Sequence, residues 1–227
     1  MLTGKRKACS NEANEYVYQF KDSLQKDIKL VFRLYNDGVA FRYEIPAMEE
    51  ALIKDELTTI RIPEGRKRWM QTYDQGYEGF YPESTTGKIT TGRNRSQQWG
   101  NPALIQVADD VWTLISEAGI EKMHSASSWK NDKVVTDYKL FLDKNEKPVS
   151  GDWFSPWRVV MIGSLADVVE STLITDVSPA SRLEDTSWIQ PGNVSWIYWA
   201  YNHGSKDYQI VKKYIDMAVD LDLPYIL

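Results

Sequence analysis

The chain is poor in the residues that build disulfides and zinc sites. Its single cysteine, Cys9, excludes an intrachain disulfide. Its two histidines, His124 and His203, have no second ligand at zinc-motif spacing, so a zinc site is not expected. There is no apolar run of about 18 residues, so no membrane-spanning helix is predicted. The first residues lack the apolar core of a signal peptide, which leaves open a signal already removed or a start further upstream.

The chain also lacks an excess of positive charge. Its 27 Lys and Arg residues face 32 Asp and Glu residues, for a net charge of −5. Nucleic-acid binding requires a concentrated basic face, so a nucleic-acid partner is not expected. The one local basic cluster, Arg66–Arg68, carries only three charges. We interpret it as a solvated loop.

Aromatic residues are abundant, with 9 Trp and 13 Tyr among 227 residues. Trp and Tyr combine a flat apolar face with a polar tip, which suits the apolar faces and hydroxyl rims of sugar rings. Large β-sheet cores use the same residues. Composition alone therefore leaves a sugar-binding protein and a β-rich core equally open.

The clearest structural pattern is a β-hairpin over residues 28–45. Apolar residues alternate with polar ones on both sides of the turn signal Asn36-Asp37-Gly38. A turn centred on Asn36 and Asp37 pairs every apolar residue with an apolar partner, and a slip of one residue would destroy that match. The predicted pairs are Leu34–Val39, Phe32–Phe41, Leu30–Tyr43 and Ile28–Ile45, with Lys29–Glu44 on the other face.

Further strands are predicted between clusters of turn residues in the first 163 residues. Many strands with little helix predict a β-sandwich over residues 1–163. The other candidate strands are residues 15–20, 58–62, 111–116, 134–142 and 158–162.

Helical spacing appears after residue 163. Apolar residues from Leu165 to Leu173 follow it, with Ser164 and Asp167 placed as a capping pair. Ser205 is predicted to cap a second helix that ends before Pro224. Ser195–Ala200 precedes this helix as a possible strand, and Tyr225–Leu227 follows it as the start of a buried one. Strand, helix and strand predict the opening of an α/β unit, incomplete at residue 227.

Four segments of the sequence, taken in order, resemble glycoside hydrolase family 97, which contains bacterial α-glucosidases and α-galactosidases. They are residues 33–43 (RLYNDGVAFRY), residues 101–105 with 112–118 (NPALI and WTLISEA), residues 155–162 (SPWRVVMI), and residues 185–192 (DTSWIQPG) continued through Trp196 and Trp199.

The resemblance implies a mainly β fold: a mutarotase-like β-sandwich, or supersandwich, over residues 1–163. The first βα unit of a truncated (β/α)₈ barrel would follow over residues 164–227. The family's catalytic carboxylates lie on later barrel strands, in keeping with active sites at the carboxyl ends of such strands. This chain would therefore contain none of them, and by itself would be inactive. The sequence leaves open whether the parent enzyme inverts or retains the configuration of the anomeric carbon.

The resemblance also implies a substrate, a cofactor and a location. The parent enzyme would cleave terminal α-glucosyl or α-galactosyl residues from oligosaccharides, and Glu117 favours the α-glucosidase branch. Glu117 matches a calcium ligand that the family takes from its N-terminal domain; without a ligand role it would be a solvent-facing residue at a strand end. Export to the periplasm is the family's usual location.

Several residues are weaker candidates. Trp188, Trp196 and Trp199 could line a sugar site or pack two domains together, with Trp188 favoured because a loop would expose it. Asp185 is better explained as a turn cap than as a sugar ligand. Asp74 and Glu78 are spaced like an acid–base pair, but they lie in a loop-like stretch over residues 73–83, for which we favour a loop that closes over the barrel mouth.

A non-enzymatic carbohydrate-binding β-sandwich is the alternative function. In this interpretation the chain is complete and its aromatic residues hold sugar. The unfinished α/β unit argues against it. No membrane partner is expected, and the sequence leaves the oligomeric state open.

Overall fold

The computed structural model describes residues 5–6, 10–89, 97–121, 126–142, 148–200 and 204–227. Cys9, His124 and His203 lie outside these ranges. Contacts divide the chain into two compact units, one running to Pro179 and the other from Ala180 to Leu227. The sequence analysis expected the β-sandwich domain to end and the barrel to begin at residue 163. That domain boundary stays a prediction.

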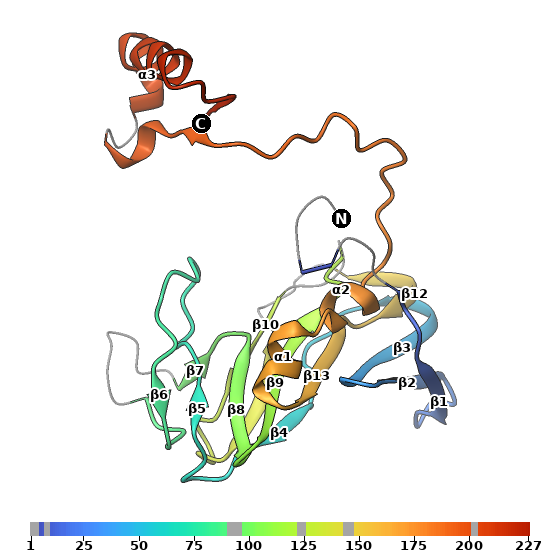
Figure 1. The fold of residues 1–227 in the computed structure, drawn as a ribbon. Coiled ribbons are helices and arrows are strands. Elements are labelled where there is room, and N and C mark those ends of the chain that lie inside the picture. The colour runs from blue at the N-terminus through green and yellow to red at the C-terminus, as the bar shows by residue number, and fades with distance from the viewer. Residues whose placement is uncertain (1–4, 7–9, 90–96, 122–125, 143–147, 201–203) are drawn as a thin grey trace. The chain divides into compact units, whose positions relative to one another are not determined.

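The first unit contains two antiparallel sheets (Figure 1). In the described ranges the larger has nine strands, in the order β1 (Asn14–Lys21), β2 (Asp27–Tyr35), β3 (Gly38–Ala51), β13 (Trp157–Gly163), β9 (Val111–Ala118), β8 (Ala103–Ala108), β5 (Arg68–Trp69) and β6 (Glu83–Ser84), with β12 (Val149–Phe154) also paired to β3. The smaller has four, in the order β4 (Thr59–Arg61), β11 (Asp137–Leu142), β10 (Ser127–Lys130) and β7 (Gln98–Trp99).

A core of alternating apolar residues joins the two sheets face to face. Ile115 from β9 is 5% exposed, and Trp129 from β10 is 3% exposed. Side chains from both sheets interdigitate in this way in β-sandwiches. The buried members of this core are Ile62, Met70, Trp99, Ala103, Ile105, Ile115, Trp129, Tyr138 and Leu140. The sandwich predicted from the strand pattern is therefore confirmed.

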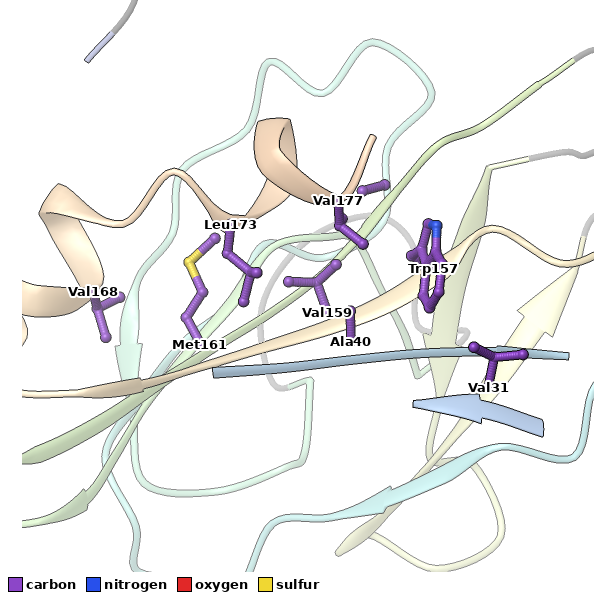
Figure 2. Close-up of a cluster of buried hydrophobic side chains, with 9 residues drawn as sticks. Val31, Ala40, Trp157, Val159, Met161, Val168, Leu173 and Val177 are labelled. Atoms are coloured by element: carbon purple, nitrogen blue, oxygen red, sulfur yellow. The ribbon is translucent and has the colours of Figure 1, made fainter. Parts of the chain in front are cut away.

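Two short helices cover the other face of the large sheet. They are α1 (Leu165–Glu170) and α2 (Leu173–Val177). Figure 2 shows Val168, Leu173 and Val177 from the helices above Met161, Val159 and Trp157 of strand β13. This second core gives the large sheet a buried region on each face.

The hairpin has the predicted register. Lys29 pairs with Glu44, Leu30 with Tyr43, Phe32 with Phe41 and Leu34 with Val39, and the turn is Asn36-Asp37. The local pattern was sufficient because only this register matches apolar to apolar. The paired apolar face is, however, only partly buried, and the deeply buried residues Val31 and Ala40 lie on the opposite face.

The helical segment after residue 163 differs from the prediction in one respect. Ser164 caps α1, and Asp167 completes the expected capping box through the Ser164 backbone N–H. The single helical stretch predicted through Leu173 is wrong, because α1 ends at Glu170. Ser171 turns to extended backbone while its N–H still bonds the Asp167 carbonyl, and α2 then begins at Leu173.

The second unit is a small α/β element. Its strands β14 (Val194–Ser195) and β15 (Tyr225–Ile226) pair in parallel, and helix α3 (Tyr208–Asp220) connects them after the 3₁₀ turns η1 (Ile197–Trp199) and η2 (Gly204–Lys206). Parallel strands require such a crossover. The predicted strand–helix–strand order is therefore present.

Three details of the second unit correct the sequence analysis. The cap of α3 is Asp207, whose carboxylate accepts from the Gln209 N–H, and Ser205 lies in η2. The strand expected over Ser195–Ala200 ends at Ser195, since η1 begins two residues later. Tyr225 and Ile226 are 41% and 40% exposed, not buried as predicted. In the described part of the chain no helix has the length and apolarity to cross a bilayer.

Gly38 provides a stability test of the hairpin and its packing. A Cβ placed there would lie 2.3 Å from the Val160 carbonyl oxygen and 2.9 Å from Leu173 Cδ2. We therefore expect Gly38→Ala to lower the free energy of unfolding by about 2 kcal/mol, because a backbone oxygen cannot move aside cheaply. Urea denaturation measures the change. Gly76→Ala, whose nearest contact would be 3.4 Å away, is the control and should change stability by less than about 0.5 kcal/mol. Equal effects of both variants would contradict the close packing of Gly38.

Candidate functional site

A buried arginine lies between two glutamates on the sandwich side of the large sheet. Arg158 comes from β13, Glu117 from the paired position of β9, and Glu56 from the segment before β4. Their side chains are 3%, 6% and 8% exposed. Arg158 Nε and Nη2 donate to the two oxygens of Glu56 at 3.0 and 2.6 Å. Arg158 Nη1 donates to Glu117 Oε2 at 2.6 Å.

Ser127 of β10 completes this cluster. Its backbone N–H donates to Glu117 Oε1 at 2.8 Å, and its hydroxyl donates to Glu117 Oε2 at 2.7 Å. Thr58 similarly donates to Glu56 Oε1 at 2.7 Å. Charges removed from water need this full set of partners, because an unpaired buried charge is very costly. The cluster thus joins the two sheets while both carboxylates remain hydrogen-bonded.

An aromatic loop over residues 73–81 lies close to Glu117. Burial raises the pKa of the Tyr77 phenol, and the nearby Tyr73 and the negative charge of Glu117 raise it further. The Tyr73 and Tyr77 rings meet edge to face, with centroids 6.1 Å apart. Tyr81 donates to the Asn101 carbonyl at 3.2 Å. The loop is therefore anchored beside the buried carboxylate by its own aromatic residues.

Asn101, at the start of the NPALI segment, connects this loop to the second sheet. Its side-chain oxygen accepts from Trp129 Nε1 at 2.7 Å, and its amide nitrogen donates to the Ser127 carbonyl at 3.1 Å. Asn101 is 9% exposed and Trp129 is 3% exposed. A buried amide with both ends satisfied fixes one geometry. Asn101 therefore holds in place the strand that supplies Ser127.

Glu117 has limited capacity to bind a metal ion. Calcium takes six to eight oxygen ligands, so a single carboxylate cannot hold it. Oε2 of Glu117 already accepts two hydrogen bonds, whereas Oε1 accepts one, from the Ser127 N–H. Among the described residues no group of three or more His, Cys, Asp or Glu side chains is placed to hold a metal ion. The residues present fit at most one ligand of a larger site.

The tryptophans proposed for sugar contact lie in the second unit. Trp188 and Trp199 are 68% and 80% exposed, and Trp196 is 39% exposed. Trp196 stacks on Tyr198 and meets Trp199 edge to face. Three aromatic residues therefore gather around η1, while Trp188 lies on the preceding loop. These rings are available for contact with another molecule or another part of a protein.

Asp185 acts as a turn cap. Its carboxylate accepts from the Ser187 N–H at 2.9 Å, and hydrogen bonds from Ser187 lower the pKa of the Asp185 carboxyl. Trp188 Nε1 donates to the Asp185 carbonyl at 3.1 Å. This is the arrangement favoured by the sequence, and it fixes the orientation of the Trp188 ring.

The sequence analysis interpreted the basic cluster Arg66–Arg68 as a solvated loop. This interpretation is wrong for one of its three residues. Arg66 and Lys67 are exposed, but Arg68 is 0% exposed. Its guanidinium donates to the Tyr138 hydroxyl at 2.9 Å and to the Pro63 carbonyl at 2.6 Å. The charge is buried because acceptors surround it, and one of them, the Tyr138 hydroxyl, lies 70 residues away, where local sequence spacing could not reveal it.

Asp74 and Glu78, considered as an acid–base pair, are both exposed in the aromatic loop.

The sequence analysis did not identify Arg158 and Glu56 as site residues. The signal for Arg158 was a charged residue inside an otherwise apolar strand, between Trp157 and Val159. Glu56 gave no signal, because its segment has no regular pattern.

A large cavity in the first unit differs in character from the carboxylate cluster. It has a volume of about 500 Å³ and lies between helices α1 and α2 and the large sheet. Leu104, Leu114, Met161 and Val168 are among its lining side chains. None of its described lining side chains is a carboxylate, the group that glycoside hydrolysis uses.

Comparison with known proteins identifies the family. Residues 1–179 match the sequence model described as "Glycosyl-hydrolase 97 N-terminal". The chain therefore belongs to glycoside hydrolase family 97, and the match covers its first unit.

Two curated relatives span nearly all of the chain. A "Probable retaining alpha-galactosidase" of Streptomyces bingchenggensis is 28% identical over 99% of this chain and 34% of that protein. A "Retaining alpha-galactosidase" of Bacteroides thetaiotaomicron is 24% identical over 96% of this chain and 38% of that protein. The chain thus spans little more than a third of either relative.

Solved structures show the same fold. A beta-arabinopyranosidase superposes with a TM-score of 0.75 at 22% identity, covering 94% of this chain and 37% of that one. A family 97 enzyme from Pseudoalteromonas sp. strain K8, in complex with acarbose, superposes with a TM-score of 0.72 at 18% identity, covering 95% of this chain and 38% of that one.

Replacement of Arg158 tests the buried cluster. Arg158→Met would leave Glu56 and Glu117 buried without their cation, so we expect the free energy of unfolding to fall by about 3–5 kcal/mol. The control is Arg61→Met, since Arg61 binds Asp137 through two nitrogens but is 74% exposed. Its loss should cost no more than about 1 kcal/mol. Urea denaturation of both variants decides the matter, and similar losses would contradict a special role for the buried arginine.

Proposed function

We propose that the protein carrying this chain is a retaining glycoside hydrolase that releases terminal α-galactosyl residues from oligosaccharides. The observation that carries the proposal is the match of almost the whole chain to two proteins named as retaining α-galactosidases. The α-glucosyl specificity favoured by the sequence analysis is the second candidate. Oligosaccharide complexes with acarbose and panose among the solved family members support an oligosaccharide substrate.

The two buried glutamates of the first unit are not free to act as a catalytic pair. Retention requires two carboxyl groups about 5–5.5 Å apart, one as nucleophile and one as acid and base. Glu56 and Glu117 are both bound to Arg158, which removes them from either role. We therefore place the catalytic carboxylates in the polypeptide outside these 227 residues, on the (β/α)₈ barrel that the βαβ element of the second unit would open.

The first unit would serve as a scaffold beside that barrel. We propose that Glu117 supplies one carboxylate oxygen to a calcium ion in the longer protein, with the remaining ligands from the barrel. When bound, calcium would supply positive charge beside the substrate. Arg158 and Ser127 hold the carboxylate in one orientation, and Oε1 is the oxygen with capacity for a further contact.

The exposed tryptophans fit a role in substrate contact. We propose that Trp188, Trp196 or Trp199 stacks on a sugar ring, supported by their exposure and by their position in the element that would open the barrel. Export to the periplasm is also a proposal, made from the family alone.

The enzymatic proposal is tested on the longer protein encoded by the reading frame that contains this chain. We expect it to hydrolyse p-nitrophenyl α-galactoside faster than the α-glucoside and to release α-galactose first, observed by proton NMR. The 227-residue chain should be inactive on both, since it lacks the carboxylate pair. A reading frame that stops after Leu227, with sugar binding but no hydrolysis, would support the carbohydrate-binding module instead.

The calcium proposal predicts different affinities for the chain and the longer protein. By calorimetry, the 227-residue chain should bind calcium no more tightly than a dissociation constant of about 10⁻³ M, because one carboxylate is not a site. The longer protein should bind it tightly, and Glu117→Gln should weaken that binding. Glu49→Gln, an exposed control on β3, should leave it unchanged. Tight binding by the 227-residue chain would refute the proposal.

A further inference from the structure

The aromatic loop over residues 73–81 presents one phenylalanine to the solvent on an anchored backbone. The loop connects β5 to β6 and projects from the sheet (Figure 1). Phe80 is 93% exposed, more than any other large apolar side chain in the described ranges. The next residue, Tyr81, donates to the Asn101 carbonyl at 3.2 Å and so holds the loop to the first unit. Phe80 is therefore positioned in advance to contact another molecule.

Two carboxylates lie beside each other on the same loop. Asp74 and Glu78 are exposed, and a Cβ placed at Gly76 would lie 3.4 Å from Asp74 Oδ2 and 3.9 Å from Glu78 Cδ. In the described part of the chain, neither side chain is paired with a cation or a hydrogen-bond donor. Burial of unpaired carboxylates against an apolar partner is costly, whereas hydroxyl groups donate to carboxylates. This surface therefore fits a ligand rich in hydroxyl groups better than an apolar protein surface.

A buried amide without partners lies directly beneath the loop. Gln71 is 1% exposed, and among the described residues neither its Oε1 nor its Nε2 has a hydrogen-bond partner. The amide lies against the backbone of Gly79, where a Cβ would be 2.5 Å from Nε2. Gly79 is itself exposed, so a single layer of backbone separates the amide from the solvent. A buried amide with both ends unsatisfied is costly, and a ligand group that both donates and accepts would remove that cost.

A sugar supplies what these three kinds of group lack. The apolar C–H face of a sugar ring packs on the flat face of an aromatic side chain. Its hydroxyl groups donate to carboxylates, and one hydroxyl can donate to an amide oxygen and accept from an amide N–H. A cation would satisfy the carboxylates alone, and an apolar segment would satisfy the phenylalanine alone. Only a ligand with an apolar face and a rim of hydroxyl groups satisfies all of them.

We propose that the aromatic loop is a saccharide-binding site of the first unit. Phe80 stacks on a sugar ring, and Asp74 and Glu78 accept hydrogen bonds from its hydroxyl groups. The Gln71 amide binds a further hydroxyl when the Gly79 backbone moves aside. The choice of an oligosaccharide as ligand rests on the proposed function, whereas the site itself needs neither the catalytic carboxylates nor the second unit.

Binding of raffinose, a trisaccharide with a terminal α-galactosyl group, to the 227-residue chain tests the site. Saturation-transfer NMR measures the dissociation constant, which we expect in the millimolar range. Phe80→Ala should raise this constant roughly five- to tenfold, since it removes the stacked ring. The control is Phe20→Ala, because Phe20 is 53% exposed on β1, at the opposite edge of the large sheet. The control should leave the dissociation constant unchanged.

Replacement of Gln71 separates ligand binding from a structural role. Gln71→Met keeps the length of the side chain and removes the two unsatisfied polar atoms, so the urea midpoint of the free chain should stay the same or rise. The dissociation constant for raffinose should nevertheless rise about threefold or more, because a hydroxyl contact is lost. A purely structural glutamine would give the reverse result, a lower midpoint with unchanged binding, and that result would remove Gln71 from the site.

Three outcomes overturn the proposal. The first is a chain that does not bind raffinose, and the second is binding that Phe80→Ala leaves unchanged while Trp199→Ala abolishes it, which would place the sugar on the second unit. The third is a longer protein in which Phe80→Ala lowers the urea midpoint and leaves the KM for raffinose unchanged, which would identify a packing contact. A longer protein that hydrolyses no glycoside, while the chain keeps its Phe80-dependent binding, would reject the proposed activity and keep this site.

Discussion

The buried charge of Arg158 is the constraint on which the inner face of the first unit depends. Its guanidinium binds carboxylates that lie 41 and 102 residues away in the sequence. A charge at 3% exposure is tolerable only with all its partners in place. Strands β13 and β9, strand β10 through Ser127 and the segment before β4 must therefore assemble together.

This constraint also explains the orientation of Glu117. A glutamate at a strand end would ordinarily rotate freely in water. Here Ser127 and Arg158 hold its carboxylate, and Asn101 with Trp129 holds the strand that carries Ser127. A carboxylate held in this way is pre-organised, which suits the calcium-ligand role proposed for Glu117. The domain would act by position and not by chemistry of its own.

The two units share one property, which is that each leaves apolar side chains exposed. The first leaves an aromatic sheet face in water, and the second leaves apolar side chains of α3 exposed, among them Ile215 at 43% and Val219 at 75%. Each exposed surface follows the regular period of its element. Regular apolar periodicity signifies burial against a neighbour, on a sheet as on a helix. Both elements therefore have the pattern of interior structure.

The sequence by itself determined what depends on neighbours along the chain: the Asn36-Asp37 turn, the register of the hairpin and the Ser164–Asp167 capping box. Alternation and cap spacing act within a few residues. The family followed from ordered motifs, again read along the chain. Only the tertiary structure decided that Arg68 and Arg158 are buried, because their acceptors come from segments as far as 70 and 102 residues away. It also decided that the apolar face of the hairpin is half uncovered, since cover depends on where the smaller sheet ends.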